Sequence, residues 1–365
     1  MPATPALRAA LKLDIVVIGA GQAGLSAAYH LRKSGLLARK DFIVVDRAPR
    51  PGGAWQFRWP SLTLSTVNRV HDLPGLGFAD FAGPDQTVRA SVAVPHYFEA
   101  YEKHFDLQVL RPAAVSVVCD RGDRLRVESD QGLFSARGII NATGTWENPY
   151  IPAYPGAETF LGQTLHTRDF TTAEAFAGKH VLIVGGGISA VQLLDQISQV
   201  THTTWVTRSP PRWRDGPFDE EAGRRAVAMV EERVRAGLPP RSVVSVTGLP
   251  VTPAIEAMRE RGVLDRNPMF SEITTTGVRW ADGTELAVDV ILWCTGFRSA
   301  LDHLAPLQLR EDTGGIVMTG RLATQVAKDP RVHLVGYGPS ASTIGANRAG
   351  AAAAQEITRF LGLSV

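Results

Sequence analysis

The chain has 365 residues, 44% hydrophobic and 20% charged, which is typical of a globular protein with two or three domains. Its 38 Lys and Arg residues nearly balance 36 Asp and Glu residues, so the composition excludes the strongly basic surface of nucleic-acid-binding proteins. Cys119 and Cys294 form neither a disulfide framework nor a CxxC motif, which argues against a dithiol reductase and predicts a reducing, cytoplasmic location.

The first predicted unit, residues 13–46, has the order strand, glycine turn, helix and strand. Residues 13–18 form a mostly apolar run, which is typical of a buried parallel strand and is too short to span a membrane. After the turn, Leu25 and Ala28 begin a helical apolar pattern, and residues 42–45 form the second strand. The segment is therefore a predicted βαβ unit.

The turn of this unit has the pattern GxGxxG, formed by Gly19, Gly21 and Gly24. The first glycine permits the tight turn, the second lets a pyrophosphate approach the backbone, and the third lets the helix pack close to the strand. Asp46 ends the second strand, where a carboxylate can accept hydrogen bonds from a ribose diol. These features predict a site for an unphosphorylated ADP group, as in FAD or NAD.

The same plan recurs at residues 180–208. Gly185, Gly187 and Ala190 form GxGxxA, an accepted variant of the turn. No acid follows the second strand, and Arg208 and Ser209 stand in its place. A guanidinium pairs with a 2′-phosphate that a carboxylate would repel, so this unit is predicted to bind NADP.

The rest of the chain supplies smaller elements. Residues 107–140 alternate as an antiparallel meander would, and residues 277–293 resemble a hairpin. Residues 210–270 are charged, with a helical stretch near residues 220–235 and no assignable chemistry, and a final helix is expected near residues 344–361. With no long linker, we expect an α/β fold of two doubly wound Rossmann-type domains, one inserted into the other.

Four further motifs carry a resemblance to a known family. They are Gly52-Gly53-Ala54-Trp55, Ala142-Thr143-Gly144, Phe160-x-Gly162-x-x-x-His166-x-x-x-Phe170, and Cys294-Thr295-Gly296-Phe297. In this order, the chain resembles the class B flavoprotein monooxygenases over nearly its whole length, and most of all their small bacterial flavin-containing monooxygenases. The resemblance implies an FAD domain at residues 1–160 and 297–365 and an NADPH domain at residues 161–296.

The resemblance also implies a reaction and a set of site residues. NADPH would reduce FAD, O2 would add to the flavin as a C4a-hydroperoxide, and a small sulfur or nitrogen nucleophile would take one oxygen atom. Ser65 and His166 are the catalytic candidates, with a structural or hinge role favoured for His166. The cofactor-binding candidates are Gly19, Gly21, Gln22, Ala23, Gly24, Asp46, Arg47, Gly53, Trp55, Thr66, Val115, Ala142, Thr143, Gly144, Gly185, Gly187, Ser189, Ala190, Arg208, Ser209, Thr295, Gly296 and Thr343.

Departures from the family pattern bear on the chemistry. Ketone-oxidising Baeyer–Villiger relatives usually end the fingerprint in Trp and carry an aspartate after GGxW, whereas this chain has Phe170 and no aspartate in residues 61–68. Ser65 stands where many relatives have asparagine, and Tyr337 stands where many have an acidic residue. A Baeyer–Villiger enzyme, an NADPH oxidase or reductase, and a non-catalytic nucleotide-binding or redox-sensing protein remain alternatives. The expected partners are a small substrate and O2, without nucleic acid, membrane or metal; a homodimer is left open.

Overall fold

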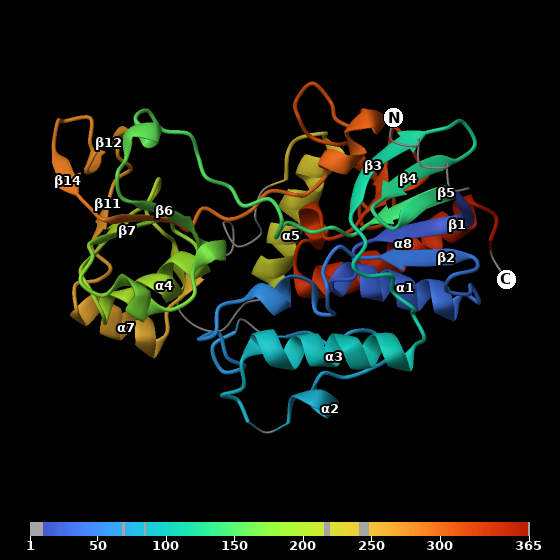
Figure 1. Cartoon of the computed structure of the whole chain (residues 1–365), viewed down its shortest axis with the longest axis horizontal. Coiled ribbons are helices and arrows are strands. Elements are labelled where there is room, and N and C mark those ends of the chain that lie inside the picture. Colours follow the sequence, from blue (N-terminus) through green and yellow to red (C-terminus); the bar gives the residue numbers. More distant parts are fainter. Residues whose placement is uncertain (1–9, 68–69, 84, 215–219, 241–247, 364–365) are drawn as a thin grey trace, which may run out of the picture.

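The computed structural model describes residues 10–67, 70–83, 85–214, 220–240 and 248–363. The two predicted units form the parallel centres of two separate sheets, each in its own lobe (Figure 1). The expected fold of two Rossmann-type domains is therefore confirmed. Within the described part of the chain, no helix combines the length and apolarity needed to cross a bilayer.

The sheet of the first lobe has the order β16-β17-β18-β5-β1-β2, and the meander β3-β4 joins it through β5. Its strands are β1 (Leu11–Ile18), β2 (Phe42–Val45), β3 (Val115–Asp120), β4 (Leu125–Ser129), β5 (Gly132–Asn141), β16 (Met318–Thr319), β17 (Gln325–Val326) and β18 (Val332–Leu334). The helices of this lobe are α1 (Gln22–Lys33), α2 (Ala79–Ala82), α3 (Ala90–His104) and α8 (Thr343–Phe360), with short turns η1 (Gly53–Phe57), η5 (Asp302–Leu307) and η6 (Gly338–Ser340).

Both faces of the first sheet are covered along the second half of β1, where residues 15–18 form a continuous buried apolar run. Ile15 and Val17 pack with α1, α3 and α8, whereas Val16 and Ile18 pack with the meander on the opposite face. Helix α8 lies close to α1 because Gly350 has no side chain there: a Cβ at this position would lie 2.8 Å from the Ala27 nitrogen. The alanine-rich C-terminal helix is thus an integral part of the first lobe's core.

The sheet of the second lobe has the order β11-β8-β7-β15-β6 and is parallel throughout. Its strands are β6 (Gln163–His166), β7 (Val181–Val184), β8 (Thr203–Val206), β11 (Arg266–Asn267) and β15 (Val290–Trp293). A small antiparallel sheet adds β12 (Glu272–Thr274), β13 (Gly277–Arg279) and β14 (Glu285–Ala287). The helices and short turns are α4 (Ile188–Ser198), α7 (Pro253–Glu260), η2 (Ala157–Thr159), η3 (Thr167–Asp169) and η4 (Ala173–Phe176).

One predicted element divides in two. The second strand of the expected hairpin at residues 277–293 is antiparallel only as β14, and β15 enters the parallel sheet between β7 and β6. Asp289 lies between the two strands and accepts a hydrogen bond from the His180 N–H at 2.7 Å. All four residues of β15 are buried, so this part of the hairpin prediction was wrong: the apolar run belongs to a central strand.

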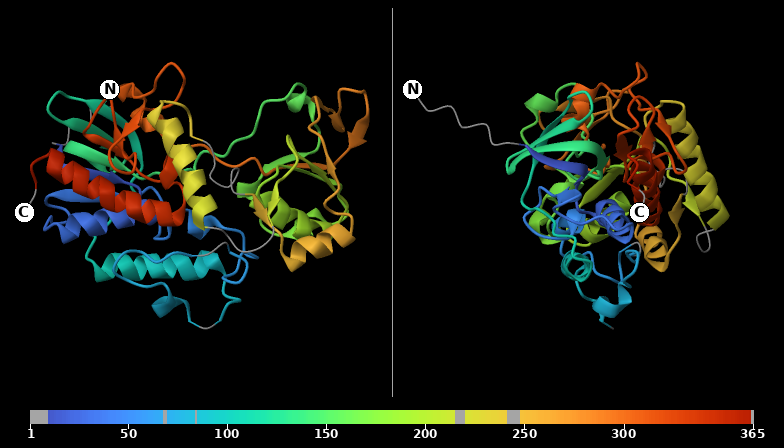
Figure 2. Two further views of the ribbon diagram at one scale, coloured as in Figure 1. Left: turned by 180° about the vertical axis from the view of Figure 1, so that it is seen from behind. Right: turned by 90° about the vertical axis from the view of Figure 1, so that its right-hand side faces the viewer.

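The strands β9 (Trp213–Arg214) and β10 (Leu249–Pro250) pair with each other beside the second lobe. The helix encoded between them, α5 (Glu220–Arg235), lies on the first lobe (Figure 2). Val234 is fully buried in the first lobe's core, and Arg235 donates to the Gly320 carbonyl at 2.7 Å. A helix encoded between the two halves of one lobe therefore packs on the other lobe.

Candidate active site

In the first glycine turn, Gly19 and Gly24 are tightly packed, whereas the space beside Gly21 is empty. Gly19 has φ +103°, and a Cβ there would lie 2.5 Å from the Ala142 carbonyl oxygen. A Cβ at Gly24 would lie 1.9 Å from the Gly19 oxygen, yet nothing lies within 4 Å of a Cβ at Gly21. Gln22 and Ala23 begin α1 beside this space. The turn thus leaves room for a phosphate at the N-terminus of a helix, where the free N–H groups favour an anion.

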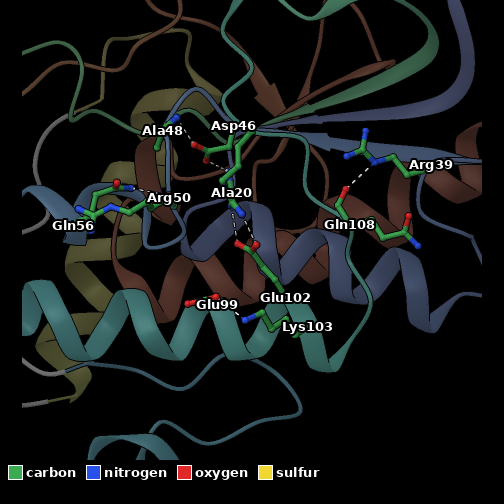
Figure 3. A network of polar contacts seen from close by, with 11 residues as sticks. Ala20, Arg39, Asp46, Ala48, Arg50, Gln56, Glu99, Glu102, Lys103 and Gln108 are labelled. Atoms are coloured by element: carbon green, nitrogen blue, oxygen red, sulfur yellow. Dashed lines mark hydrogen bonds and ion pairs between the residues drawn. The ribbon is translucent and has the colours of Figure 1, made fainter.

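Asp46 lies at the mouth of this turn (Figure 3). Its carboxylate accepts hydrogen bonds from the Ala20 N–H at 2.5 Å and the Ala48 N–H at 2.7 Å, and the residue is 7% exposed. Burial raises its pKa most, while the two N–H donors and the charges of Arg111 and Arg47 oppose the rise. Both oxygens are fixed by the backbone and keep lone pairs for ribose hydroxyls. Val115 begins β3 nearby, since the Ala113 N–H donates to the Asp46 carbonyl at 2.7 Å.

Three other segments approach the same turn. Gly53, in η1, has φ +52°, and a Cβ there would lie 3.0 Å from the Gly21 Cα. The segment that carries Gly144 approaches the turn through Thr143, whose nitrogen would lie 3.2 Å from a Cβ at Gly19. Thr343 begins α8, which is joined to α1 because Gln22 Nε2 donates to Asn347 Oδ1 at 2.9 Å. The structure therefore gathers around one opening the segments that carry the predicted FAD residues.

A chain of side-chain hydrogen bonds holds the segment that follows β5. The Asn141 amide donates to Thr143 Oγ1 at 3.0 Å, and that hydroxyl donates to the Ala300 carbonyl at 2.7 Å. His303 Nε2 donates to Asn141 Oδ1 at 2.7 Å, and burial lowers the pKa of His303 to about 4, so its ring is neutral at pH 7. Asn141 and His303 were missed in the sequence because His303 lies in η5, far along the chain from β5.

The two chain segments that connect the lobes run side by side. The Tyr150 N–H donates to the Gly296 carbonyl at 3.0 Å, and the Ala300 N–H donates to the Gly144 carbonyl at 3.0 Å. Thr295 Oγ1 donates to the Tyr150 carbonyl. The predicted residues Ala142, Thr143 and Gly144 thus lie on one connection, and Thr295 and Gly296 on the other.

The second glycine turn repeats the design of the first. Gly185 has φ +143°, and a Cβ there would lie 2.3 Å from the Cys294 carbonyl oxygen. Gly187 again has nothing within 4 Å of a Cβ position, whereas Ala190 is fully buried. Ser189 lies between them in the first turn of α4. Two open helix N-termini, one in each lobe, can therefore each hold a pyrophosphate.

Cations follow β8 where an acid follows β2. Arg208 and Ser209 are exposed, and among the described residues Arg208 makes no hydrogen bond or ion pair. Arg266, in the neighbouring strand β11, donates through Nη1 to the Thr207 carbonyl at 3.1 Å and has no carboxylate partner in the described chain. Sequence reasoning missed Arg266, because a two-residue strand gives no periodic signal that would place it beside β8.

His166 is fully enclosed and held by both ring nitrogens. Its Nδ1 accepts from the Arg168 N–H at 3.1 Å, so Nε2 carries the proton and donates to the Gly296 carbonyl at 2.9 Å. Its backbone N–H donates to Asp169 Oδ2 at 2.9 Å. The ring is 1% exposed, and burial is the main cause that lowers its pKa. This neutral ring ties the start of the second lobe to the second connection.

Ser65 lies on a loop that docks on the second lobe. The Ser61 hydroxyl donates to Gln196 Oε1 at 2.6 Å, and Gln192 Nε2 donates to the Thr66 carbonyl at 3.1 Å; both glutamines belong to α4. Ser65 is exposed, and its hydroxyl lies 2.8 Å from Thr63 Oγ1. In the described chain no hydrogen bond joins Ser65 to His166, so the two catalytic candidates belong to different parts of the interlobe region.

Comparisons with known proteins agree with this arrangement. The profile of the pyridine nucleotide-disulphide oxidoreductase family matches residues 16–336. The flavin-containing monooxygenase from Stenotrophomonas maltophilia is 36% identical and superposes with a TM-score of 0.78 over 96% of this chain and 99% of that one. The chain belongs to the class B flavoprotein monooxygenases. It is a flavin-dependent oxidoreductase that uses FAD and NADPH, with O2 and a small molecule as substrates.

Other relatives of this flavin monooxygenase differ in substrate. The indole-3-pyruvate monooxygenase YUCCA1 of Oryza sativa subsp. japonica is 29% identical over 330 residues, covering 78% of this chain and 76% of the relative. A Baeyer-Villiger monooxygenase of Streptomyces coelicolor is 28% identical over 233 residues, covering 62% of this chain and 42% of that protein. The family is therefore shown, whereas the kind of atom that receives oxygen is not.

One departure from the family pattern has a structural counterpart. Tyr337 is 4% exposed and packs in the first lobe's core with Val234 and Leu304, so its side chain supplies no charge to the FAD opening. Burial raises the pKa of this phenol. The same segment continues through η6 into α8, where Ser342 caps the helix by accepting from the Gly345 N–H at 3.1 Å.

Proposed function

We propose that this enzyme transfers one oxygen atom from O2 to a small sulfur or nitrogen nucleophile. FAD is held by residues 1–160 and 297–365, and NADPH by residues 161–296. The observation that carries the proposal is a pair of open glycine turns, one in each lobe. The first unit ends in the fixed carboxylate of Asp46, and the second in the guanidinium of Arg208, which has no partner among the described residues. When bound, FAD supplies the redox chemistry, accepting hydride from NADPH and activating O2.

The protein's part is to bind, orient and exclude water. The turns at Gly21 and Gly187 receive the two pyrophosphates, Asp46 receives the FAD ribose, and Arg208 with Arg266 receives the 2′-phosphate. His166 is neutral and has both ring nitrogens occupied, so its role is to join the lobes rather than to move a proton. Ser65 lies on the loop that α4 anchors and would offer its exposed hydroxyl to the bound flavin from there.

Support for a soft nucleophile comes from the chemistry of that loop. Residues 61–67 contain no carboxylate, and their polar side chains are the hydroxyl groups of Ser61, Thr63, Ser65 and Thr66. The aspartate that Baeyer–Villiger relatives carry after GGxW has no equivalent there. An oxygen acceptor that is itself nucleophilic needs no ionised protein group for activation.

The test is a balance of products. The purified holoenzyme is supplied with NADPH, O2 and either methyl phenyl sulfide or cyclohexanone, and NADPH consumed is compared with sulfoxide, lactone and hydrogen peroxide formed. We expect sulfoxide without lactone. Lactone as the main product would establish the Baeyer–Villiger alternative. If, with both compounds, the hydrogen peroxide formed equals the NADPH consumed, the enzyme is an oxidase.

A further inference from the structure

Arg58 lies between two tryptophans that belong to different parts of the cofactor region. It directly follows η1, and its guanidinium carbon is 4.9 Å from the ring centre of Trp146, on the first connection, and 5.9 Å from that of Trp55. The side chain is half-buried, and burial lowers its pKa. Cation–π contacts of this kind hold a guanidinium in place but leave its N–H donors unused.

Among the described residues, no acceptor meets those donors. The Arg58 backbone N–H donates to the Trp55 carbonyl at 3.2 Å, but the guanidinium makes no hydrogen bond and no ion pair there. The nearby carboxylate of Glu147 is engaged elsewhere, 3.4 Å from Arg47 Nη1 and 3.2 Å from Arg168 Nη2. Arg168 also lies 5.7 Å from the Trp146 ring centre. Two guanidinium groups, those of Arg58 and Arg168, thus lie over Trp146, and the carboxylate of Glu147 is shared between Arg168 and Arg47 rather than paired with Arg58.

Burying a cation without a hydrogen-bond partner costs folding free energy, and a bound anion would offset that cost. Guanidinium groups prefer carboxylates and phosphates, which they bind through two parallel hydrogen bonds. The phosphates of the two dinucleotides already have places at Gly21, Gly187 and Arg208, at the ends of other elements. With the dinucleotide phosphates assigned elsewhere, the substrate is the remaining source of an anion for Arg58.

An apolar surface adjoins the cation. Phe57 precedes Arg58, stacks on Trp146 with ring centres 6.0 Å apart, and is 42% exposed. A small molecule that pairs an acidic group with an apolar body would contact both side chains. Resting on the proposed function, we infer that Arg58 is a substrate-binding residue that selects oxygen acceptors carrying a carboxylate.

Binding of probes without an oxidisable atom tests the site directly. Benzoate and benzamide are titrated into the oxidised holoenzyme while the flavin absorbance spectrum and the tryptophan fluorescence are followed. A single charge-assisted contact should make the Kd of benzoate at least about tenfold lower than that of benzamide. Equal Kd values, or no binding of benzoate, would overturn the inference.

Variants distinguish the source of the anion. Arg58→Gln should abolish the preference for benzoate, Arg58→Lys should keep part of it, and Arg298→Gln, which removes an exposed guanidinium 3.9 Å from the Tyr150 ring centre, should keep all of it. If Arg58→Gln instead weakens NADP⁺ or FAD binding and leaves the benzoate preference intact, Arg58 holds a dinucleotide phosphate and the inference is wrong.

Turnover separates this inference from the proposed function. The pair 4-(methylthio)benzoate and 4-(methylthio)benzamide differs only in charge at one end, and we expect a lower KM for the acid in the wild type and equal KM values in Arg58→Gln. Oxygenation of both compounds with equal KM in the wild type would refute the role of Arg58 and leave the function standing. A benzoate preference without oxygenation of either thioether would refute the function and leave the anion site standing.

Discussion

Replacement of Arg208 by Ala should weaken recognition of the 2′-phosphate without harming the fold. Arg208 is exposed and has no hydrogen-bond or ion-pair partner among the described residues, so the described part of the fold loses no such bond when the side chain is removed. A hydrogen bond to a charged group contributes about 1.5–3 kcal/mol, and exposure to solvent places this contact near the lower end. We therefore expect a loss of about 10-fold in affinity for 2′-phosphorylated ligands and an unchanged Tm.

The assay compares two ligands that differ by the 2′-phosphate alone. The Kd values of 2′,5′-ADP and 5′-AMP are measured by calorimetry for the wild type, for Arg208→Ala and for Arg261→Ala, whose guanidinium pairs with Asp195 near the C-terminal end of α4. Only Arg208→Ala should lose affinity, and only for 2′,5′-ADP. An equal loss for 5′-AMP would show that Arg208 does not read the 2′-phosphate.

The remaining predictions concern a second cation, the flavin, the loop and a buried histidine. Arg266→Ala should also weaken 2′,5′-ADP binding but lower the Tm as well, because Nη1 holds the Thr207 carbonyl; an unchanged Kd would remove Arg266 from the site. Denaturation should release free FAD, and FMN or no flavin would contradict the cofactor assignment of the first lobe. Ser65→Asn should shift product from hydrogen peroxide to sulfoxide, since an amide offers two donors where a hydroxyl offers one. An unchanged ratio of sulfoxide to hydrogen peroxide would show that Ser65 is not the cause of peroxide release. Burial lowers the pKa of His333 to about 4, below its ordinary 6.5, so the stability from its neutral form is present above pH 6.5 and is lost as pH falls toward 4. The melting temperature of His333→Gln should fall less steeply over that window than that of the wild type, and parallel curves would exclude His333 as the cause.

The parts of the fold that the sequence predicted are those whose signal is local. Gly24 is required by its contact with the Gly19 oxygen inside one βαβ unit, and the glycine spacing alone predicts the turn, its strand and its helix together. The unit at Gly185 could be predicted from the same spacing, although Gly19 and Gly185 themselves pack on the distant carbonyls of Ala142 and Cys294. The hairpin prediction was wrong at β15 for the opposite reason: a short buried apolar run fits either an antiparallel or a parallel partner, and residues in β7 and β6, more than a hundred positions upstream, decide between them.

The site shows the same division between local and distant information. Asp46 ends a strand, and its role follows from its place in the unit, whereas Arg266 reaches the end of β8 only because β11 adds to the sheet edge. Arg58 contacts Trp146, a residue of a distant segment, and this contact cannot be read from the sequence around Arg58. Likewise, Val234 of α5 packs against Gly338, where a Cβ would lie 3.0 Å from Val234 Cγ1. The two dinucleotide turns can thus be recognised in contiguous segments, whereas the place of Arg266, the surroundings of Arg58 and the packing of α5 depend on contacts between segments far apart in the chain.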